Sequence, residues 1–171
     1  MQQDQPLEIE RKYLIAMPPR TLLEQLCTRR IDMVQTYLLG TQGERALRVR
    51  QSTCGGVTRW RLNDKRAVTE LTRIELEREL TQEEYETYLQ QADPALQPIV
   101  KTRWCIPFDG HTLEIDVFSF WDDRAFCEVE LSSEDEAVHL PEWMHVVRDV
   151  SGDRRYLNSA LAASLPDEPI A

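Results

Sequence analysis

The chain has 171 residues, 42% of them hydrophobic, which is enough for one domain with a core of its own. Its 30 acidic and 20 basic residues give a net charge of −10, which argues against a nucleic-acid binder that works mainly by charge. No apolar stretch is long enough to span a membrane and the N-terminus has no signal-peptide core, so we expect a cytoplasmic protein that binds neither nucleic acid nor membrane.

Neither the cysteines nor the histidines have metal-site spacing. The four cysteines are Cys27, Cys54, Cys105 and Cys127. None forms a CxxC pair, which argues against a zinc ribbon or a thioredoxin-type site, and we expect reduced thiols. The histidines are His111, His139 and His145, for which we expect solvated or structural roles.

The first predicted element is a strand over residues 7–15, with the sequence LEIERKYLI. Glu8, Glu10 and Lys12 fall at alternate positions, and apolar residues take most of the positions between them. This alternation predicts a β-strand with one charged face and one apolar face.

A helix and three charged strands are predicted next. The helix, TLLEQLCTRR over residues 21–30, opens with Thr21 and Glu24, which have the spacing of a capping box. The strands cover residues 45–51, 58–65 and 73–79. Charged residues take alternate positions in each of them, as Arg48 and Arg50 do in the first.

A second helix, over residues 80–92, is predicted from the capping-box pair Thr81 and Glu84. Three further strands of alternating pattern follow it, over residues 100–106, 113–118 and 126–131.

The C-terminal part is predicted to be helical and to end in a tail. A short helix is expected from Ser133, and a last helix after Asp153 that turns Tyr156 and Leu161 inward. Residues 166–171 are expected to form a frayed tail, so that the single domain spans residues 1–165.

The charges are sorted by strand. Acidic residues gather around Glu8–Glu10, Glu114–Asp116 and Glu128–Glu130, and basic residues around Arg48–Arg50, Arg59–Lys65 and Lys101–Arg103. A single strand of this kind is an ordinary solvated sheet face. Like charges on one face repel each other, however, so the sorting has a cost that bound counter-charge would offset.

Closing about eight such strands into an antiparallel barrel turns the charged faces inward and predicts an α+β fold with helices packed outside. The basic rows then suit a polyanion such as a chain of phosphates, because arginine presents forked donors to phosphate oxygens. The carboxylates suit a hard-oxygen site for Mg²⁺ or Mn²⁺. The alternative is an α+β domain whose charged sheet face merely meets water.

Taken together, the strand motifs resemble the CYTH superfamily, also called the triphosphate tunnel metalloenzymes. The motifs are an ExExK strand at Glu8-Ile9-Glu10-Arg11-Lys12, the arginine strand RALRVR, R-x-E-x-E at Arg73, Glu75 and Glu77, K-x-R at Lys101 and Arg103, the acidic strands LEIDVF and CEVEL, and the closing segment GDRRYLNSALA. Their order and spacing match over residues 7–162. The resemblance implies an eight-stranded tunnel and divalent-metal chemistry on triphosphates, most like that of bacterial inorganic triphosphatases.

The resemblance also implies roles for individual residues. Glu8, Glu10, Glu128 and Glu130 would hold the metal. Phosphate oxygens would be bound by Lys12, Arg48, Arg50, Arg61, Lys65, Lys101, Arg103 and Arg155. Asp116, Glu75 and Glu77 would bind a second ion or orient the attacking water.

One position departs from the family pattern. In the fourth strand such enzymes often carry a lysine where this chain has Asn63, which can donate a hydrogen bond to phosphate but brings no charge. Arg61 and Lys65 share its strand face, so a neighbour could take over the role.

The expected reaction is the hydrolysis of inorganic tripolyphosphate to pyrophosphate and phosphate. A class IV adenylyl cyclase, a nucleoside or thiamine triphosphatase, and a polyphosphate- or nucleotide-binding module without activity remain alternatives. The sequence carries no signal of oligomeric state, and a homodimer stays open.

Overall fold

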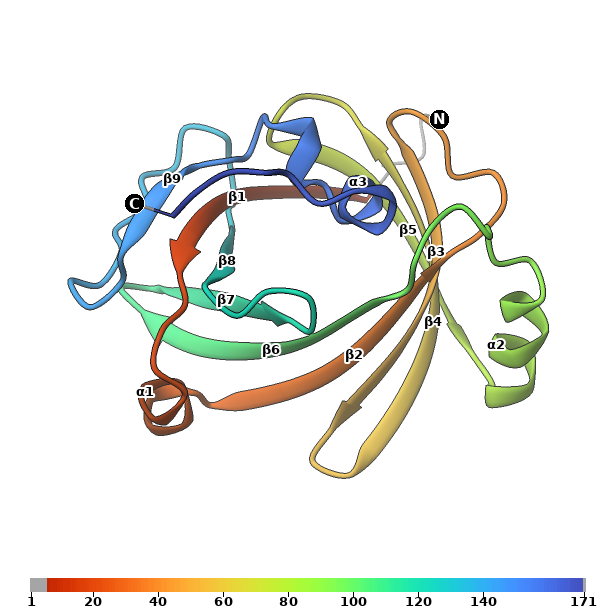
Figure 1. The fold of residues 1–171 in the computed structure, drawn as a ribbon, viewed down its shortest axis with the longest axis horizontal. Coiled ribbons are helices and arrows are strands. Elements are labelled where there is room, and N and C mark those ends of the chain that lie inside the picture. The colour runs from red at the N-terminus through yellow and green to blue at the C-terminus, as the bar shows by residue number, and fades with distance from the viewer. Residues whose placement is uncertain (1–5, 171) are drawn as a thin grey trace.

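Eight strands pair in the order β1-β5-β4-β3-β2-β6-β7-β8 and return to β1, which closes an antiparallel barrel (Figure 1). This computed structural model describes residues 6–170. The barrel strands are β1 (Leu7–Ala16), β2 (Arg29–Tyr37), β3 (Arg45–Cys54), β4 (Val57–Ala67), β5 (Thr72–Leu80), β6 (Ile99–Phe108), β7 (His111–Phe118) and β8 (Arg124–Glu130). The predicted eight-stranded barrel is thereby confirmed.

The seam of the barrel lies at β1. Two strands, β5 and β9, pair with different parts of the same edge of β1. Its first residues pair with β5, and its C-terminal half pairs with the additional short strand β9 (Val146–Asp149). Where β5 gives way to β9, the Glu10 amide donates to the Leu71 carbonyl and the Lys12 carbonyl accepts from the Val150 amide. The backbone of Glu10 and Lys12 is thus held from this edge as well as by β8.

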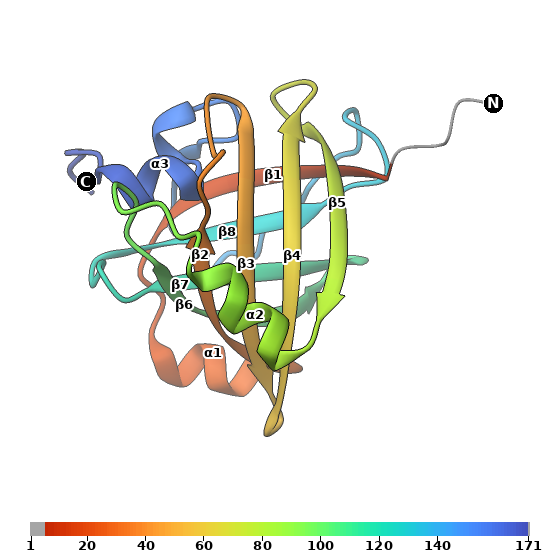
Figure 2. The same cartoon turned by 90° about the vertical axis from the view of Figure 1, so that its right-hand side faces the viewer.

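Short helices cover the outside of the barrel. They are α1 (Arg20–Leu26) and α2 (Gln82–Leu89). The third helix, α3 (Asn158–Ala163), follows a 3-10 turn over Arg154–Tyr156 and packs instead on interior residues such as Leu14 and Phe126, so the prediction that the helices lie outside does not hold for it. Figure 2 shows α2 lying against the outer face of the wall that contains β3 and β4. None of the helices within residues 6–170 is long and apolar enough to cross a membrane.

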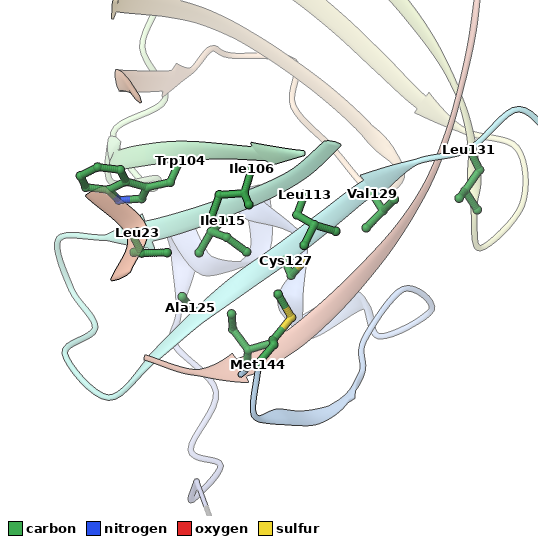
Figure 3. Close-up of a cluster of buried hydrophobic side chains, with 11 residues drawn as sticks. Leu23, Trp104, Ile106, Leu113, Ile115, Ala125, Cys127, Val129, Leu131 and Met144 are labelled. Atoms are coloured by element: carbon green, nitrogen blue, oxygen red, sulfur yellow. The ribbon is translucent and has the colours of Figure 1, made fainter. Parts of the chain in front are cut away.

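The largest core lies on the outer face of β6, β7 and β8. Leu23 of α1 packs there with strand residues such as Ile106, Ile115 and Val129, and Met144 closes the cluster from the segment after β8 (Figure 3). A second outer core forms where Tyr85 of α2 packs on the β3–β4 wall. The apolar strand faces therefore point outward under helices, as predicted.

An aromatic plug fills part of the barrel interior, which the charge pattern does not predict. Its buried members include Leu14, Tyr37, Phe118, Phe126 and Tyr156. Leu14 and Phe126 are paired residues on the strand faces that carry Lys12 and Glu128 further along. The plug places a packed core directly beside the charged part of the interior.

The first helix differs from the prediction at both ends. It begins at Arg20 after an N-cap at Pro19, so Thr21 lies inside the helix and does not cap it. The Glu24 carboxylate instead accepts from Arg20 Nε at 2.9 Å. It ends at Leu26 instead of residue 30. The Thr81–Glu84 capping box of α2 is confirmed.

The segment from residue 29 onward forms β2, which the sequence pattern does not predict. The residues of β2 that line the interior include Ile31 and Met33, which are uncharged, so the strand lacks the alternation of charged and apolar residues.

The helix expected from Ser133 does not form. Glu136, which would lie in it, instead accepts hydrogen bonds from Ser132 and from His111 Nε2, and this ties the segment into turns. His111 thereby has a structural role.

Residues 166–170 contain no helix or strand, yet they are not free of the barrel. The Glu168 carboxylate accepts from Arg148 Nε at 2.8 Å and from the Tyr156 hydroxyl. The backbone carbonyl of Glu168 accepts from the Arg124 guanidinium. The expectation of a frayed tail is therefore wrong for Glu168.

Replacing Phe126 with alanine tests the plug. Phe126 is fully buried and packs edge-to-face on Phe118, Trp121 and Tyr156, so we expect the free energy of unfolding to fall by about 3–5 kcal/mol. Urea unfolding followed by circular dichroism measures it. The control Leu76→Ala removes a half-exposed side chain from the outer wall and should cost less than about 1 kcal/mol. Equal losses in the two variants would contradict a plug that supports the fold.

Candidate active site

The interior of the barrel holds a cavity of about 1180 Å³ that residues from all eight barrel strands line. The predicted site residues that line it are Glu8, Glu10, Lys12, Arg48, Arg50, Arg61, Lys65, Glu75, Glu77, Lys101, Arg103, Glu128 and Glu130. The charged strand faces thus turn inward, because each strand presents every second side chain to the same side. Asp116 and Arg155 are not among the lining residues.

Carboxylates crowd the wall formed by β1 and β8. Glu10 lies directly opposite Glu130 in the strand register, and Glu8 is the next residue on the same face of β1. Burial and the charges of Glu128 and Glu8 raise the pKa of Glu10 to about 7. Burial and the charges of Glu8 and Glu10 also raise the pKa of Glu130. This wall carries more negative charge than its neighbours neutralise.

Glu128 has a different environment from the other acids of this wall. Its carboxylate lies 3.5 Å from Lys12 Nζ and 3.2 Å from Arg103, and it is buried. Despite burial, the positive charges of Lys12, Arg103 and Lys101 hold its pKa well below the usual range. Glu128 is therefore already neutralised by protein cations.

Asp116 contacts the basic residues of β6 and does not line the cavity, although it was predicted to bind a second ion or to orient the attacking water. It is fully buried and accepts from Lys101 Nζ at 2.5 Å and from Arg103 Nε at 2.8 Å. Its position between the two cations fits a residue that fixes their side chains. The neighbouring Glu114, two residues earlier on the same strand face, is the acid that reaches the cavity.

Glu114 is a lining residue that was not assigned a role from the sequence. It forms an ion pair with Arg103. Burial, together with the charges of Glu128, Asp116 and Glu130, raises its pKa to about 7 against the lowering effect of Arg103. Its shared strand face with Asp116 was a usable signal, but alternation does not tell which of two acids lies deeper.

The opposite wall, formed by β3 and β4, carries excess positive charge. Burial and the charges of Arg48 and Arg103 lower the pKa of Arg50 to about 10. The buried Nε–H groups of Arg48, Arg50 and Arg61 find no acceptor among residues 6–170. Unpaired buried donors are costly, and an anion in the cavity would satisfy them.

Two ion pairs join β1 to β4 and β5 across the seam of the barrel. Lys65 Nζ lies 2.9 Å from the Glu8 carboxylate, and Arg73 lies 3.6 Å from that of Glu10. Arg73 lines the cavity and was not assigned a role, although it shares a strand face with Glu75 and Glu77. The R-x-E-x-E motif was the signal that could have identified it.

Glu8, Glu10 and Glu130 have the chemistry of a divalent-cation site. Carboxylate oxygens are the ligands that Mg²⁺ and Mn²⁺ prefer, and a cation would offset the burial and the repulsion that together raise the pKa of Glu10 and Glu130. Within residues 6–170 no three His, Cys, Asp or Glu side chains converge into a formed metal site. In this structure Lys65 forms an ion pair with Glu8, and Arg73 forms a longer one with Glu10.

Arg155 lies outside the cavity. Its guanidinium bonds to Asp153 at 2.7 Å and stacks over the Tyr156 ring, and it is exposed. Its neighbour Arg154 lines the cavity instead and pairs with Glu44 in the loop between β2 and β3. A turn has no alternating register, so the pattern could not tell which of the two arginines borders the cavity.

Comparison with known proteins gives concordant results. Residues 6–149 match the CYTH domain. An inorganic triphosphatase of Nitrosomonas europaea is 32% identical in an alignment that covers 93% of this chain and 99% of that protein. One from Acetivibrio thermocellus is 35% identical over 85 residues, 46% of this chain and 53% of that protein, so the match spans about half of that relative. A crystal structure of an inorganic triphosphatase superposes with a TM-score of 0.59 at 29% identity, covering 93% of this chain and 96% of that one.

Replacing Glu114 with glutamine tests the charge balance of the cavity. Because the folded-state pKa of Glu114 is about 7 and its ordinary value is 4.5, the folded chain keeps this proton to a higher pH than the unfolded chain. The wild type should therefore lose stability as the pH rises from about 4.5 to about 7, and the variant should lack this contribution.

Melting temperatures measured without divalent metal, at about pH 5 and about pH 8, give the comparison. The difference between Glu114→Gln and wild type should shift in favour of the variant at the higher pH. A difference that does not change with pH would contradict the raised pKa.

Proposed function

This chain belongs to the CYTH family, and on that premise we propose that it hydrolyses a triphosphate in the barrel cavity with the help of a divalent metal ion. The substrate we propose is inorganic tripolyphosphate, which water splits into pyrophosphate and phosphate. The observation that carries the proposal is the cavity wall on which Arg48, Arg50 and Arg61 hold buried, unpaired N–H donors. The inorganic triphosphatase that is 32% identical over nearly the whole chain supports the choice of substrate.

Substrate binding is the task of basic residues on two walls of the cavity. Arg48, Arg50 and Arg61 lie on the β3–β4 wall, and Lys12, Lys101 and Arg103 lie on β1 and β6. Phosphoryl transfer asks mainly for positioning and charge neutralisation, which two facing rows of cations provide for a chain of phosphates. Lys65 would join them when its ion pair with Glu8 is exchanged for a phosphate oxygen.

In the proposed reaction, a water oxygen forms a bond to the terminal phosphorus, and the anhydride bond to the middle phosphate breaks. The pyrophosphate leaves with the electron pair of that bond, and the attacking water releases its proton to the surrounding carboxylates or solvent. The basic rows hold the three phosphates in line and stabilise the negative charge on the leaving group.

We propose that Glu8, Glu10 and Glu130 hold the metal ion, and the chemistry of these oxygen ligands suits Mg²⁺ or Mn²⁺. When bound, the ion supplies charge withdrawal from the phosphate oxygens. Glu128 was predicted to be a fourth ligand, but its ion pairs suit it better to fixing Lys12 and Arg103. Asp116 has the same fixing role for Lys101.

A substrate panel tests the proposed function. Phosphate release from tripolyphosphate, ATP, thiamine triphosphate and longer polyphosphate is measured with Mg²⁺ and with Mn²⁺. We expect the highest kcat/KM for tripolyphosphate and none without metal. Cyclic AMP from ATP would indicate a cyclase, and tripolyphosphate binding without release under either metal would indicate a binding module; either result would overturn the proposal.

Replacing Glu130 with alanine tests the metal ligands. Loss of one of three carboxylates should lower kcat by about 100-fold or more and raise the metal concentration needed for half-maximal rate. The matched control is Glu142→Ala, which removes an exposed glutamate outside the barrel cavity and should leave both values unchanged. Near-wild-type turnover by Glu130→Ala would refute the assignment.

Replacing Arg50 with alanine tests the phosphate-binding wall. Removing a buried cation of the β3–β4 wall should lower kcat/KM for tripolyphosphate by about 100-fold, because a charge-assisted contact in a desolvated site is lost. Arg155→Ala serves as the control, since Arg155 is exposed and is not among the residues that line the cavity, and its replacement should leave kcat/KM unchanged. If the two variants lose activity equally, the cavity is not where the phosphates bind.

A further inference from the structure

We propose that Asn63 is a positioning residue, a neutral hub that fixes Glu75, Glu77 and Arg50 of the cavity wall; its catalytic effect rests on the proposed function. Asn63 is fully buried in β4. Its Nδ2 donates to Glu75 Oε1 at 3.1 Å and to Glu77 Oε2 at 2.8 Å. Its Oδ1 accepts from Arg50 at 3.4 Å.

These contacts leave Asn63 without a donor for substrate. An amide carries two N–H donors, and both are directed to the carboxylates of β5. The expectation that Asn63 donates to phosphate therefore does not match its contacts. The positive charge on this face of β4 comes from Arg61 and Lys65, one lumen-facing position to either side.

A neutral side chain at this point fits the charges around it. In the strand register Asn63 lies between Arg48 of β3 and Glu77 of β5. A cation here would face the buried Arg48, and an anion would face Glu77 and Glu75; like charges in directly paired positions repel. An amide offers donors to the acids and an acceptor to Arg50 without adding charge.

Asn63 contacts the proposed substrate-binding residues Arg61 and Lys65 indirectly, because its partners Glu75 and Glu77 form ion pairs with them. Glu77 is 2.9 Å from Arg61 and 3.7 Å from Arg50, and Glu75 is 3.9 Å from Lys65. Fixing two carboxylates and one guanidinium thus sets the place of three cations that face the cavity. Asn63 acts on the reaction through them and touches no reacting atom.

Kinetics of Asn63 variants with tripolyphosphate test the hub. Asn63→Ala should lower kcat/KM by about 10- to 100-fold, and Asn63→Asp should do the same although it keeps the side-chain volume, because it replaces a donor by a charge beside two acids. In the Glu75→Gln/Glu77→Gln background, Asn63→Ala should have less than half of its effect on a logarithmic scale, since its charged partners are gone. The control Gln51→Ala removes a side-chain amide whose one bond within residues 6–170 is to Trp60, and it should leave kcat/KM unchanged.

Unchanged activity in Asn63→Ala together with a gain in Asn63→Lys would overturn the proposal, because position 63 would then be a place where a phosphate-binding cation is missing. Fully additive effects in the Glu75→Gln/Glu77→Gln background would overturn it as well.

Melting temperatures without substrate separate this proposal from the proposed function. The shift caused by Asn63→Ala should be clearly smaller in the Glu75→Gln/Glu77→Gln background than in the wild type, whether or not the protein hydrolyses a triphosphate. A wild type that releases no phosphate would refute the proposed function alone. Additive melting-temperature shifts would refute the hub alone.

Discussion

The fold depends on how charge is buried inside the barrel. A charge taken out of water is tolerated when an opposite charge or hydrogen bonds compensate it, and most cavity acids have such a partner. The pairs Glu8–Lys65 and Glu10–Arg73 connect β1 to β4 and β5, where only three residues of β1 pair with β5. The cavity charges therefore also help to hold the seam of the barrel closed.

This compensation is uneven, and the unevenness suits a ligand. The β1–β8 wall has surplus negative charge at Glu10 and Glu130, whereas the β3–β4 wall has arginine donors without acceptors. A divalent cation would reduce the negative charge of the β1–β8 wall, and an anion would accept from the arginine donors of the β3–β4 wall. A metal-bound phosphate chain carries both charges in one ligand, which is why two opposed excesses in one cavity favour it over either ion alone.

Period-two alternation was enough to predict seven of the eight barrel strands and the inward direction of their charged faces, because a side chain's face follows from its parity alone. It failed at β2, where Ile31 and Met33 face inward without charge. The alternation also could not predict how deeply each inward-facing side chain is buried. Phe126 and Glu128 share a face, as do Asp116 and Glu114, and only the tilt and closure of the strands decide which of each pair packs inside and which lines the cavity.

The aromatic plug explains how Lys12 and Lys101 are held in position in a cavity without ligand. Lys12 Nζ lies 4.7 Å from the ring centre of Phe126 and donates to the Tyr156 carbonyl, while Lys101 Nζ lies 5.6 Å from the ring centre of Phe118. Each lysine thus touches an aromatic face on one side and a carboxylate on the other, Glu128 for Lys12 and Asp116 for Lys101. Such contacts restrict the rotamers of long side chains before substrate arrives, so less ordering remains to be done on binding. The core that stabilises the barrel and the cations that face its cavity are in this way one packed unit.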